Sequence, residues 1–220
     1  MWKFYTGAMD SLKPIDILVA NGDMIEGKGE SSEGVELITP DRHDQVRMAA
    51  EAIEYTEARH VRIMYGTRRH VGKEEDFESV LADSLKGMGV TVQGHAFMNV
   101  NGVNIDVKHK VGSSVIPHGR FTAIARSRMW NVIWNSEHER QPKADILIRS
   151  HVHYFGHAGG ASWLGVTTPA LTYNSSYGVR ECEGLVDVGM IVFDFDEKGN
   201  YEWNPILAGF ADLKVSPESL

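Results

Sequence analysis

Apolar and polar positions along the chain follow two periods, which predict helices and strands in turn. Short apolar runs ending in polar, glycine-containing segments predict buried strands at residues 15–20 and 61–65. Apolar residues at helical spacing predict helices over residues 2–12, 41–59, 74–86 and 120–137, with Asp41 as the N-cap of the second. The first half of the chain is therefore expected to alternate strands and helices.

The second half is richer in predicted strands. Asn101-Gly102 is a strong hairpin signal between two of them. The expected strands span residues 90–93, 96–100, 103–109 and 146–150, followed by antiparallel strands at 164–166, 189–195 and 201–205. Alternation followed by a strand-rich half predicts a layered α/β domain, and no internal repeat or linker divides residues 1–220.

Composition supports one domain and narrows its partners. The 220 residues are 42% hydrophobic and 24% charged, enough for one sizeable core. The net charge is −8, which argues against nucleic-acid binding by an overall basic surface. An anionic substrate would then need positive charge supplied locally, for example by metal ions. Ten histidines are a mild indication of metal chemistry.

The single cysteine, Cys182, excludes an internal disulfide and a cysteine-rich zinc site. No apolar run reaches the roughly 18 residues of a membrane span, and the N-terminus does not resemble a secretory signal. We therefore expect a soluble, cytoplasmic protein without a membrane partner.

Residue types that bind metals lie at or just after four predicted strands. They are Asp23, His70, His109 and the pair His151 and His153. Each has an ordinary alternative interpretation: an aspartate that caps a turn, or a solvated histidine. Ligands of open α/β sheets collect at the carboxyl ends of strands, so one fold could bring all of them together. Carboxylate and imidazole ligands suit metal-assisted hydrolysis, in which two ions clamp a phosphoryl group and activate water.

These motifs resemble the calcineurin-like metallophosphoesterases. Gly22-Asp23-Met24-Ile25-Glu26 is similar to the G-D-x-x-[DE] block of that family, and residues 66–70 occupy the place of its G-N-H-[DE] block. His109 matches its isolated histidine, and residues 150–153 match G-H-x-H. The likeness covers roughly residues 15–155, and the flanking segments at 150–155 and 168–171 are similar to phage-type members. The resemblance implies a layered α/β/β/α sandwich of the metallo-dependent phosphatase type.

The resemblance also implies roles. Asp23 would bridge two metals, His109 and His151 would bind one ion, and His153 would bind the other. His70 would be the catalytic histidine that contacts the phosphate and leaving group, although it is displaced by one position. Glu26 would order the loop. The remaining assignments are Thr67 in place of an asparagine ligand, and Arg68 and Arg69 as phosphate contacts.

One block of the family is absent. No aspartate before Asp23 is followed by histidine two residues on, so the D-x-H block and its strand are missing, which leaves the second metal with few ligands. An unpaired sheet edge predicts a homo-oligomer, in which a neighbouring chain could supply a ligand. The histidines available for this are His43, His95, His118, His138 and His157.

The sequence thus predicts a hydrolase that cleaves a phosphomonoester or phosphodiester with metal-activated water. A phosphodiester, in a nucleotide or nucleic acid, is favoured by the phage-type likeness. The cofactor would be one or two ions of Mn, Zn or Fe, with Mg less suited to imidazole. The alternative is a weak or inactive remnant that keeps a metal as a binding or structural module. A third hypothesis is an α/β domain without metal.

Overall fold

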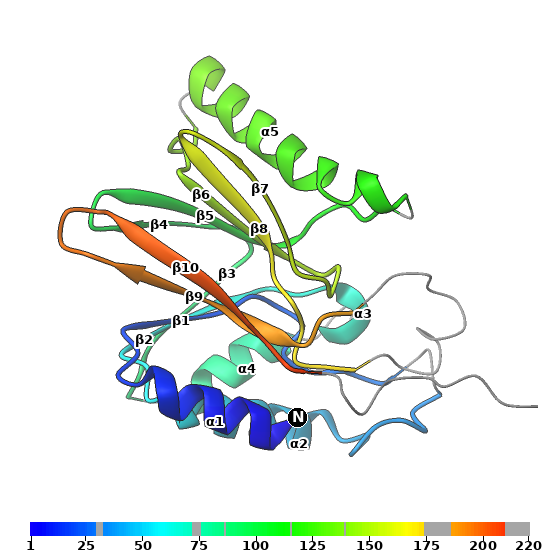
Figure 1. Cartoon of the computed structure of the whole chain (residues 1–220). Coiled ribbons are helices and arrows are strands. Elements are labelled where there is room, and N and C mark those ends of the chain that lie inside the picture. Colours follow the sequence, from blue (N-terminus) through cyan, green and yellow to red (C-terminus); the bar gives the residue numbers. More distant parts are fainter. Residues whose placement is uncertain are drawn as a thin grey trace, which may run out of the picture.

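The computed structural model describes residues 1–29, 33–71, 76–85, 87–114, 116–138, 140–173 and 186–209. Figure 1 shows helices on two sides of a strand-rich centre. Cys182 lies outside the described residues.

The N-terminal helices α1 (Trp2–Leu12) and α2 (Arg42–Tyr55) pack against each other. The Tyr5 hydroxyl donates a hydrogen bond of 2.6 Å to the Ala52 carbonyl. The predicted N-cap of α2 is confirmed, because the Asp41 carboxylate accepts from the N–H groups of His43 and Asp44. This bonding satisfies donors that the first turn of a helix leaves unpaired.

The first sheet holds three parallel strands in the order β1 (Ile17–Ala20), β2 (His60–Met64) and β3 (Gly89–Gln93). Its outer face packs against α2 and α4 (Phe77–Ser84). Fully buried Val61, Ile63 and Leu81 lie at the centre of this layer. The alternation of strands and helices in the first half of the chain is therefore confirmed.

The second sheet has the order β4-β5-β6-β8-β7. These strands span Ala96–Val100, Val103–Lys110, Ile146–Ser150, Trp163–Thr167 and Gly156–Gly160 in that order. The β4–β5 hairpin at Asn101-Gly102 is confirmed. The second helical layer is α5 (Thr122–His138), which covers the outer face of β6, β7 and β8.

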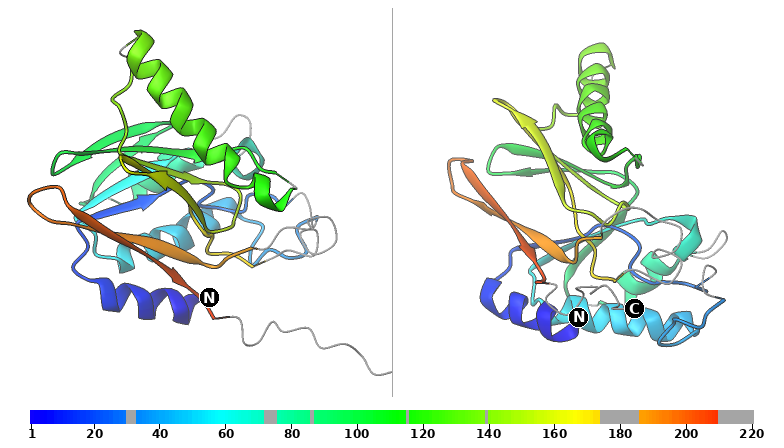
Figure 2. Two further views of the ribbon diagram at one scale, coloured as in Figure 1. Left: turned by 45° about the horizontal axis from the view of Figure 1, so that its top comes forward. Right: turned by 45° about the vertical axis from the view of Figure 1, so that its right-hand side comes forward.

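The inner faces of the two sheets enclose the central core, which includes Met64 from β2 with Val107, Ile148 and Val166. The antiparallel pair β9 (Gly189–Phe195) and β10 (Tyr201–Leu207) also packs on this core. The two views in Figure 2 show α5 on one side of the strands and α1 with α2 on the other. The predicted α/β/β/α layering is confirmed.

Some local predictions were wrong. Strand β8 is antiparallel to β7, as expected, but it also runs parallel to β6, which was not predicted. Strand β7 was missed because its sequence, Gly-His-Ala-Gly-Gly, lacks the β-branched residues typical of strands. The helix expected at 74–86 is shorter, as α4, and a separate turn of helix, α3 (Arg68–Val71), precedes it.

Residues 1–16 hold α1 and contribute no strand to the first sheet. Strand β1 pairs with β2, and the described chain places no strand on its other edge. The missing family block and the homo-oligomer inferred from it stay predictions. Among the described helices, none combines the length and the apolar composition that crossing a membrane requires.

Candidate metal centre

Loops at the carboxyl ends of three parallel strands and the end of β5 meet at one place. Asp23 follows β1, Thr67 follows β2, His109 lies at the end of β5, and His151 follows β6. Thr67 donates two hydrogen bonds to Asp23 Oδ1, one from its N–H at 2.6 Å and one from its hydroxyl at 3.2 Å. The predicted convergence of strand ends is thus observed, and Asp23 is at its centre.

Gly66 makes this approach feasible. A Cβ at position 66 would lie 2.2 Å from Asp23 Oδ1 and 2.3 Å from the Asp23 nitrogen. Real Cβ atoms do not come this close to other heavy atoms, so glycine is required here. The close contact sets the distance between the two loops.

A break in the register of β5 positions His109. The β5–β6 pairing shifts between Lys108 and Lys110, which leaves His109 as the bulged residue. Bulges commonly redirect side chains beside functional sites. The ring is 4% exposed, and its Nδ1 lies 2.6 Å from the Asn21 carbonyl oxygen. Because a carbonyl can only accept, Nδ1 carries the proton, and the neutral ring presents the lone pair of Nε2.

That lone pair faces the free oxygen of Asp23. His109 Nε2 and Asp23 Oδ2 are 3.0 Å apart. Both atoms are buried, and neither takes part in a hydrogen bond of acceptable geometry within the described chain. When the His109 ring is neutral, these two buried acceptors face each other without a donor, which is costly unless a proton or a metal ion lies between them. His151 completes the group: one ligand atom from each of the three residues lies within 4.8 Å of the other two.

The three residues fit a divalent transition metal. A carboxylate oxygen and imidazole nitrogens are ligands for Zn, Mn and Fe, at distances of about 2.0–2.2 Å for Zn. Donors separated by 3.0 Å can share an ion at that distance. The Nδ1–H of His109 bonded to a backbone carbonyl is the usual second contact of a metal-binding histidine. The group therefore supports the predicted ligands Asp23, His109 and His151, without identifying the metal.

In the metal-free chain, each of these two groups shifts the pKa of the other toward its charged form. Burial would raise the pKa of Asp23, but the His109 imidazole and the Thr67 N–H lower it to about 2. Burial would lower the pKa of His109, but the Asp23 carboxylate and the Asn21 carbonyl outweigh it and raise the pKa above 6.5. A proton therefore competes with a metal for His109.

The loop after β6 carries the two remaining histidines in strained conformations. His151 has φ 75° and His153 has φ 56°, in the left-handed region that histidine seldom adopts. Asp187 holds this loop, since its N–H donates to the His153 carbonyl and its carboxylate accepts from the Phe155 N–H. Burial lowers the pKa of both histidines, which keeps them neutral and able to bind metal. Strain of this kind is typical of functional sites.

The other predicted site residues lie around this group. His153 is half-buried and is not one of the three residues with ligand atoms within 4.8 Å of one another, so its binding of a second ion stays a prediction. His70 Nε2 is 3.8 Å from Asp23 Oδ2, and His70 Nδ1 is 3.2 Å from the Glu26 carbonyl oxygen. Arg68 lines a pocket of about 440 Å³ together with Thr67 and His109. The side chain of Arg69 lies outside the described part of the chain.

Two residues of the site were not predicted from the sequence. Asn21 orients His109 through its carbonyl, and its amide donates to the Ser150 hydroxyl at 2.7 Å. Glu78, on α4, is 1% exposed and accepts a hydrogen bond of 2.9 Å from the Gly66 N–H. Asn21 stands two residues before Asp23 and could have been noticed there. Nothing in the sequence around Glu78 marks it, because only the packing of α4 brings it beneath Gly66.

Several of the other histidines are engaged elsewhere. His95 Nε2 is 2.9 Å from the buried Asp106 carboxylate, and the rings of His43 and His157 pack edge-on against Phe77 and Trp203. The side chain of His138 lies outside the described part of the chain. A ligand supplied by a second chain stays a prediction.

No protein-family model and no curated protein matches this sequence. Solved structures do match. An archaeal phosphodiesterase aligns over 93% of both chains with a TM-score of 0.50 and 10% identity. Vps29 from Entamoeba histolytica in complex with Zn²⁺ aligns over 87% of this chain and 98% of its own, with a TM-score of 0.40 and 15% identity. A predicted phosphoesterase from Streptococcus pneumoniae TIGR4 aligns over 87% and 97%, with a TM-score of 0.38 and 12% identity.

At 10% identity, the match to the archaeal phosphodiesterase shows the fold alone. The chain has the layered α/β/β/α fold that its motifs predicted, and it shares this fold with that phosphodiesterase. A shared fold does not assign a reaction, which has to be argued from the site.

Proposed function

We propose that this protein is a metal-dependent phosphoesterase that hydrolyses a phosphodiester. The observation that carries the proposal is the pair of buried, unsatisfied acceptors, Asp23 Oδ2 and His109 Nε2, 3.0 Å apart with His151 beside them. A bound divalent ion supplies Lewis acidity toward a phosphoryl oxygen and activates water for attack. Asp23, His109 and His151 would hold it, and His153 would bind a second ion.

The chain's own residues position the reaction around that ion. Thr67 anchors Asp23 Oδ1, which leaves Oδ2 as the free ligand atom. The His70 Nε2 lies 3.8 Å from that atom, close enough to meet a phosphate oxygen or the leaving oxygen. We assign His70 as the catalytic residue that hydrogen-bonds the phosphate and donates a proton to the leaving group. Arg68, in the adjoining pocket, supplies a cation for the substrate phosphate.

The same fold in an archaeal phosphodiesterase agrees with a diester substrate. A phosphomonoester remains the competing substrate class, and the rates of hydrolysis of a diester and a monoester distinguish the two classes. The second candidate function is a module that holds one metal without catalysis. This non-catalytic function is favoured because only three of the described residues bring ligand atoms within 4.8 Å of one another, which is enough for one metal ion.

The test combines metal content with turnover. Protein purified without chelator and incubated with Mn²⁺, Zn²⁺ or Fe²⁺ is assayed for bound metal by elemental analysis and for hydrolysis of bis(p-nitrophenyl) phosphate. We expect at least one ion per chain, and hydrolysis that chelator abolishes. Asp23→Asn should lose both the metal and the activity, while Glu54→Gln, which changes an exposed carboxylate on α2, should keep both.

Three results would contradict the proposal. Chelator-insensitive hydrolysis would exclude metal dependence. Bound metal without hydrolysis of either the diester or p-nitrophenyl phosphate would favour the non-catalytic module. Faster turnover of p-nitrophenyl phosphate than of the diester would assign a monoesterase.

A further inference from the structure

A cationic path leads away from the metal centre along the end of β5. The pocket that contains His109 and Arg68 is also lined by Lys108 and Lys110. The same two lysines line a second pocket, of about 330 Å³, which extends to Arg126 and Trp130 on α5. The two pockets therefore adjoin, and Lys108 and Lys110 form their common wall.

Within the described chain, the cations on this path have no acidic partner. Lys108, Lys110 and Arg126 form no ion pair with a described carboxylate, and no described residue that lines either pocket is acidic. The chain as a whole carries a net charge of −8, so three unpaired cations in one place are not the average composition of its surface. Such a patch attracts an anion with several charges in a row.

Arg126 lies close to the backbone at the end of the sheet. A Cβ at Gly112 would lie 2.9 Å from Arg126 Nη2, so the guanidinium lies directly over the backbone that follows β5. This places a charge of α5 beside the charges of β5. Although they belong to different elements, the three cations therefore form a single surface.

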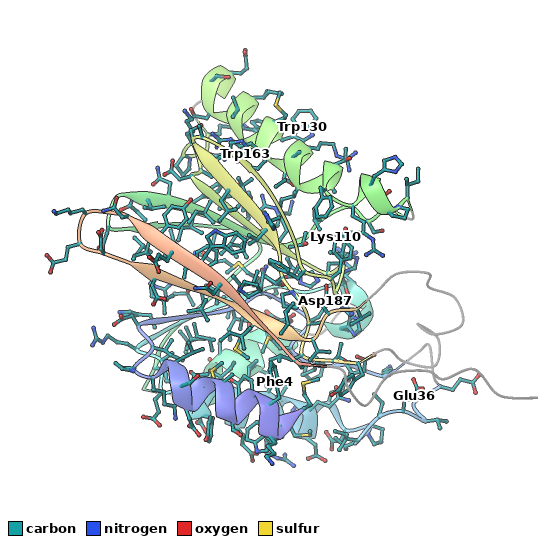
Figure 3. The ribbon with its side chains drawn as sticks, viewed as in Figure 1. Phe4, Glu36, Lys110, Trp130, Trp163 and Asp187 are labelled. Atoms are coloured by element: carbon teal, nitrogen blue, oxygen red, sulfur yellow. The ribbon has the colours of Figure 1, made fainter. Side chains whose placement is uncertain are left out.

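An aromatic ring lies at the far end of the same path. Trp130 is 56% exposed, on the solvent-facing side of α5, next to the exposed Met129. Figure 3 shows Trp130 on α5 and Lys110 below the same helix, where the sheet ends. Exposed tryptophan beside a row of cations is the arrangement by which proteins hold single-stranded nucleic acid: cations contact successive phosphates, and the ring stacks on a base.

We infer that the polymeric substrate of this site is a single-stranded nucleic acid, whose backbone runs from the metal centre over Lys108 and Lys110 to Arg126 and stacks a base on Trp130. The inference rests on the proposed phosphodiesterase function and names its substrate class. The phosphodiester at the metal centre would be one link of the chain, and its neighbours would occupy the cationic path. Small diesters would reach the metal centre without using this path.

The test uses the full chain with Mn²⁺ for turnover and chelated protein for binding. Fluorescence anisotropy measures binding of a labelled single-stranded DNA or RNA of about 20 nucleotides at about 50 mM salt. Bis(p-nitrophenyl) phosphate serves as the small substrate. Arg126→Glu and Trp130→Ala change the path at residues remote from the ligand group. Lys198→Glu, in the β9–β10 turn at the opposite end of the molecule, and Trp2→Ala, at a ring 54% exposed, are the matched controls.

We expect each α5 variant to bind the oligonucleotide at least about fivefold more weakly and to cleave it correspondingly more slowly. The kcat/KM for the small diester should not change, and the two controls should behave as wild type in both assays. Circular dichroism melting confirms that each variant is folded. A variant that melts early is replaced by Arg126→Gln or Trp130→Leu.

The proposal is overturned if the wild type hydrolyses the small diester but neither binds nor cleaves the oligonucleotide, or if the α5 variants match wild type on it. Stronger binding to anionic phospholipid vesicles than to the oligonucleotide, with the same dependence on Arg126, would assign the path to a lipid surface. Oligonucleotide binding that depends on Arg126 and Trp130, without hydrolysis of any ester, would retain the path and reject the phosphodiesterase.

Discussion

His109 Nε2 and Asp23 Oδ2 lie 3.0 Å apart in a buried place where neither accepts a hydrogen bond from the described chain. The Asn21 carbonyl holds the opposite ring nitrogen and the two Thr67 donors hold the opposite carboxylate oxygen. Each side chain is therefore anchored at one atom and free at the other. Anchoring of this kind preorganises ligands, so little entropy is lost when an ion binds.

Replacing Gly66 by alanine should separate the two loops of the site. The new Cβ would have to lie 2.2 Å from Asp23 Oδ1, so the Asp23 loop must shift and its ligand atom with it. We expect a loss of about 1–3 kcal/mol in unfolding free energy and a strong loss of metal affinity. Urea denaturation and titration calorimetry with Mn²⁺ measure the two effects.

Gly94→Ala is the matched control, because Gly94 lines the same pocket and a Cβ added there would meet no atom within 4 Å. It should leave both quantities near wild type. Unchanged metal binding in Gly66→Ala would show that the Asp23 position is not set by this contact.

The stability of the metal-free protein should have an optimum near neutral pH. His109 has a raised pKa in the folded chain, so its contribution is complete below about 6.5, the unfolded value, and is lost as the pH rises through the folded pKa. His151 and His153 have lowered pKa values, so their contribution is present above about 6.5 and is lost as the pH falls through the folded pKa. Thermal melting in chelator from pH 5 to 9 measures both sides.

His109→Gln should remove the loss of stability at alkaline pH, and His153→Gln should reduce the loss of stability at acid pH. Bound metal should remove the loss of stability at alkaline pH, because deprotonated His109 is the form that binds an ion. The metal affinity should therefore rise with pH. A metal-free melting temperature that does not change over this range would contradict the assignment.

The buried ion pair between Asp106 and Arg149 should be the most sensitive charged contact away from the site. Arg149 Nη1 is 2.8 Å from Asp106 Oδ1, and the two residues are 4% and 1% exposed. Asp106→Ala leaves a buried guanidinium without its carboxylate and should cost about 3–5 kcal/mol in urea denaturation. Glu57→Ala, which breaks the solvent-exposed pair with Lys13, should cost far less. Equal costs would show that Arg149 is compensated by its backbone acceptors.

The same pair should weaken in acid. Burial would raise the pKa of Asp106, but His95 and Arg149 outweigh it and lower the pKa. Its contribution is therefore present above the unfolded value of about 3.9 and is lost as the pH falls through the folded pKa. In Asp106→Ala, this part of the acid dependence should disappear.

His70→Ala should separate catalysis from metal binding. The ring lies beside the ligand group without belonging to it, so the metal content should not change. Loss of a positioned proton donor lowers kcat by about 10²–10⁴. The decrease should be smaller for a diester with a good leaving group, such as p-nitrophenolate, than for a poor one. Equal decreases for both would make His70 a phosphate-binding residue only.

The sequence by itself determined most of the helices and strands and the residue types that gather at their ends. The apolar runs before Asp23 and before His151 are long enough for a buried strand and for nothing else, and the Asp41 cap and the Asn101-Gly102 turn use local chemistry that survives in any tertiary context. The prediction that Asp23, His109 and His151 come together at strand ends also held, because β1, β5 and β6 end at the same place. Strand β7 was not predicted, because a glycine-rich strand has no local sequence signal and forms only by pairing with its neighbour β8.

Only the tertiary structure decided which atoms face each other. The bulge that turns His109 inward depends on the pairing of β5 with β6, and the carbonyl that selects its tautomer comes from Asn21, 88 positions earlier in the chain. The burial of Glu78 beneath Gly66, and the approach of Arg126 to Gly112, arise from packing between helices and strands that are distant in sequence. Periodicity records which face of an element is buried, but the identity of its contacts depends on how the layers are stacked.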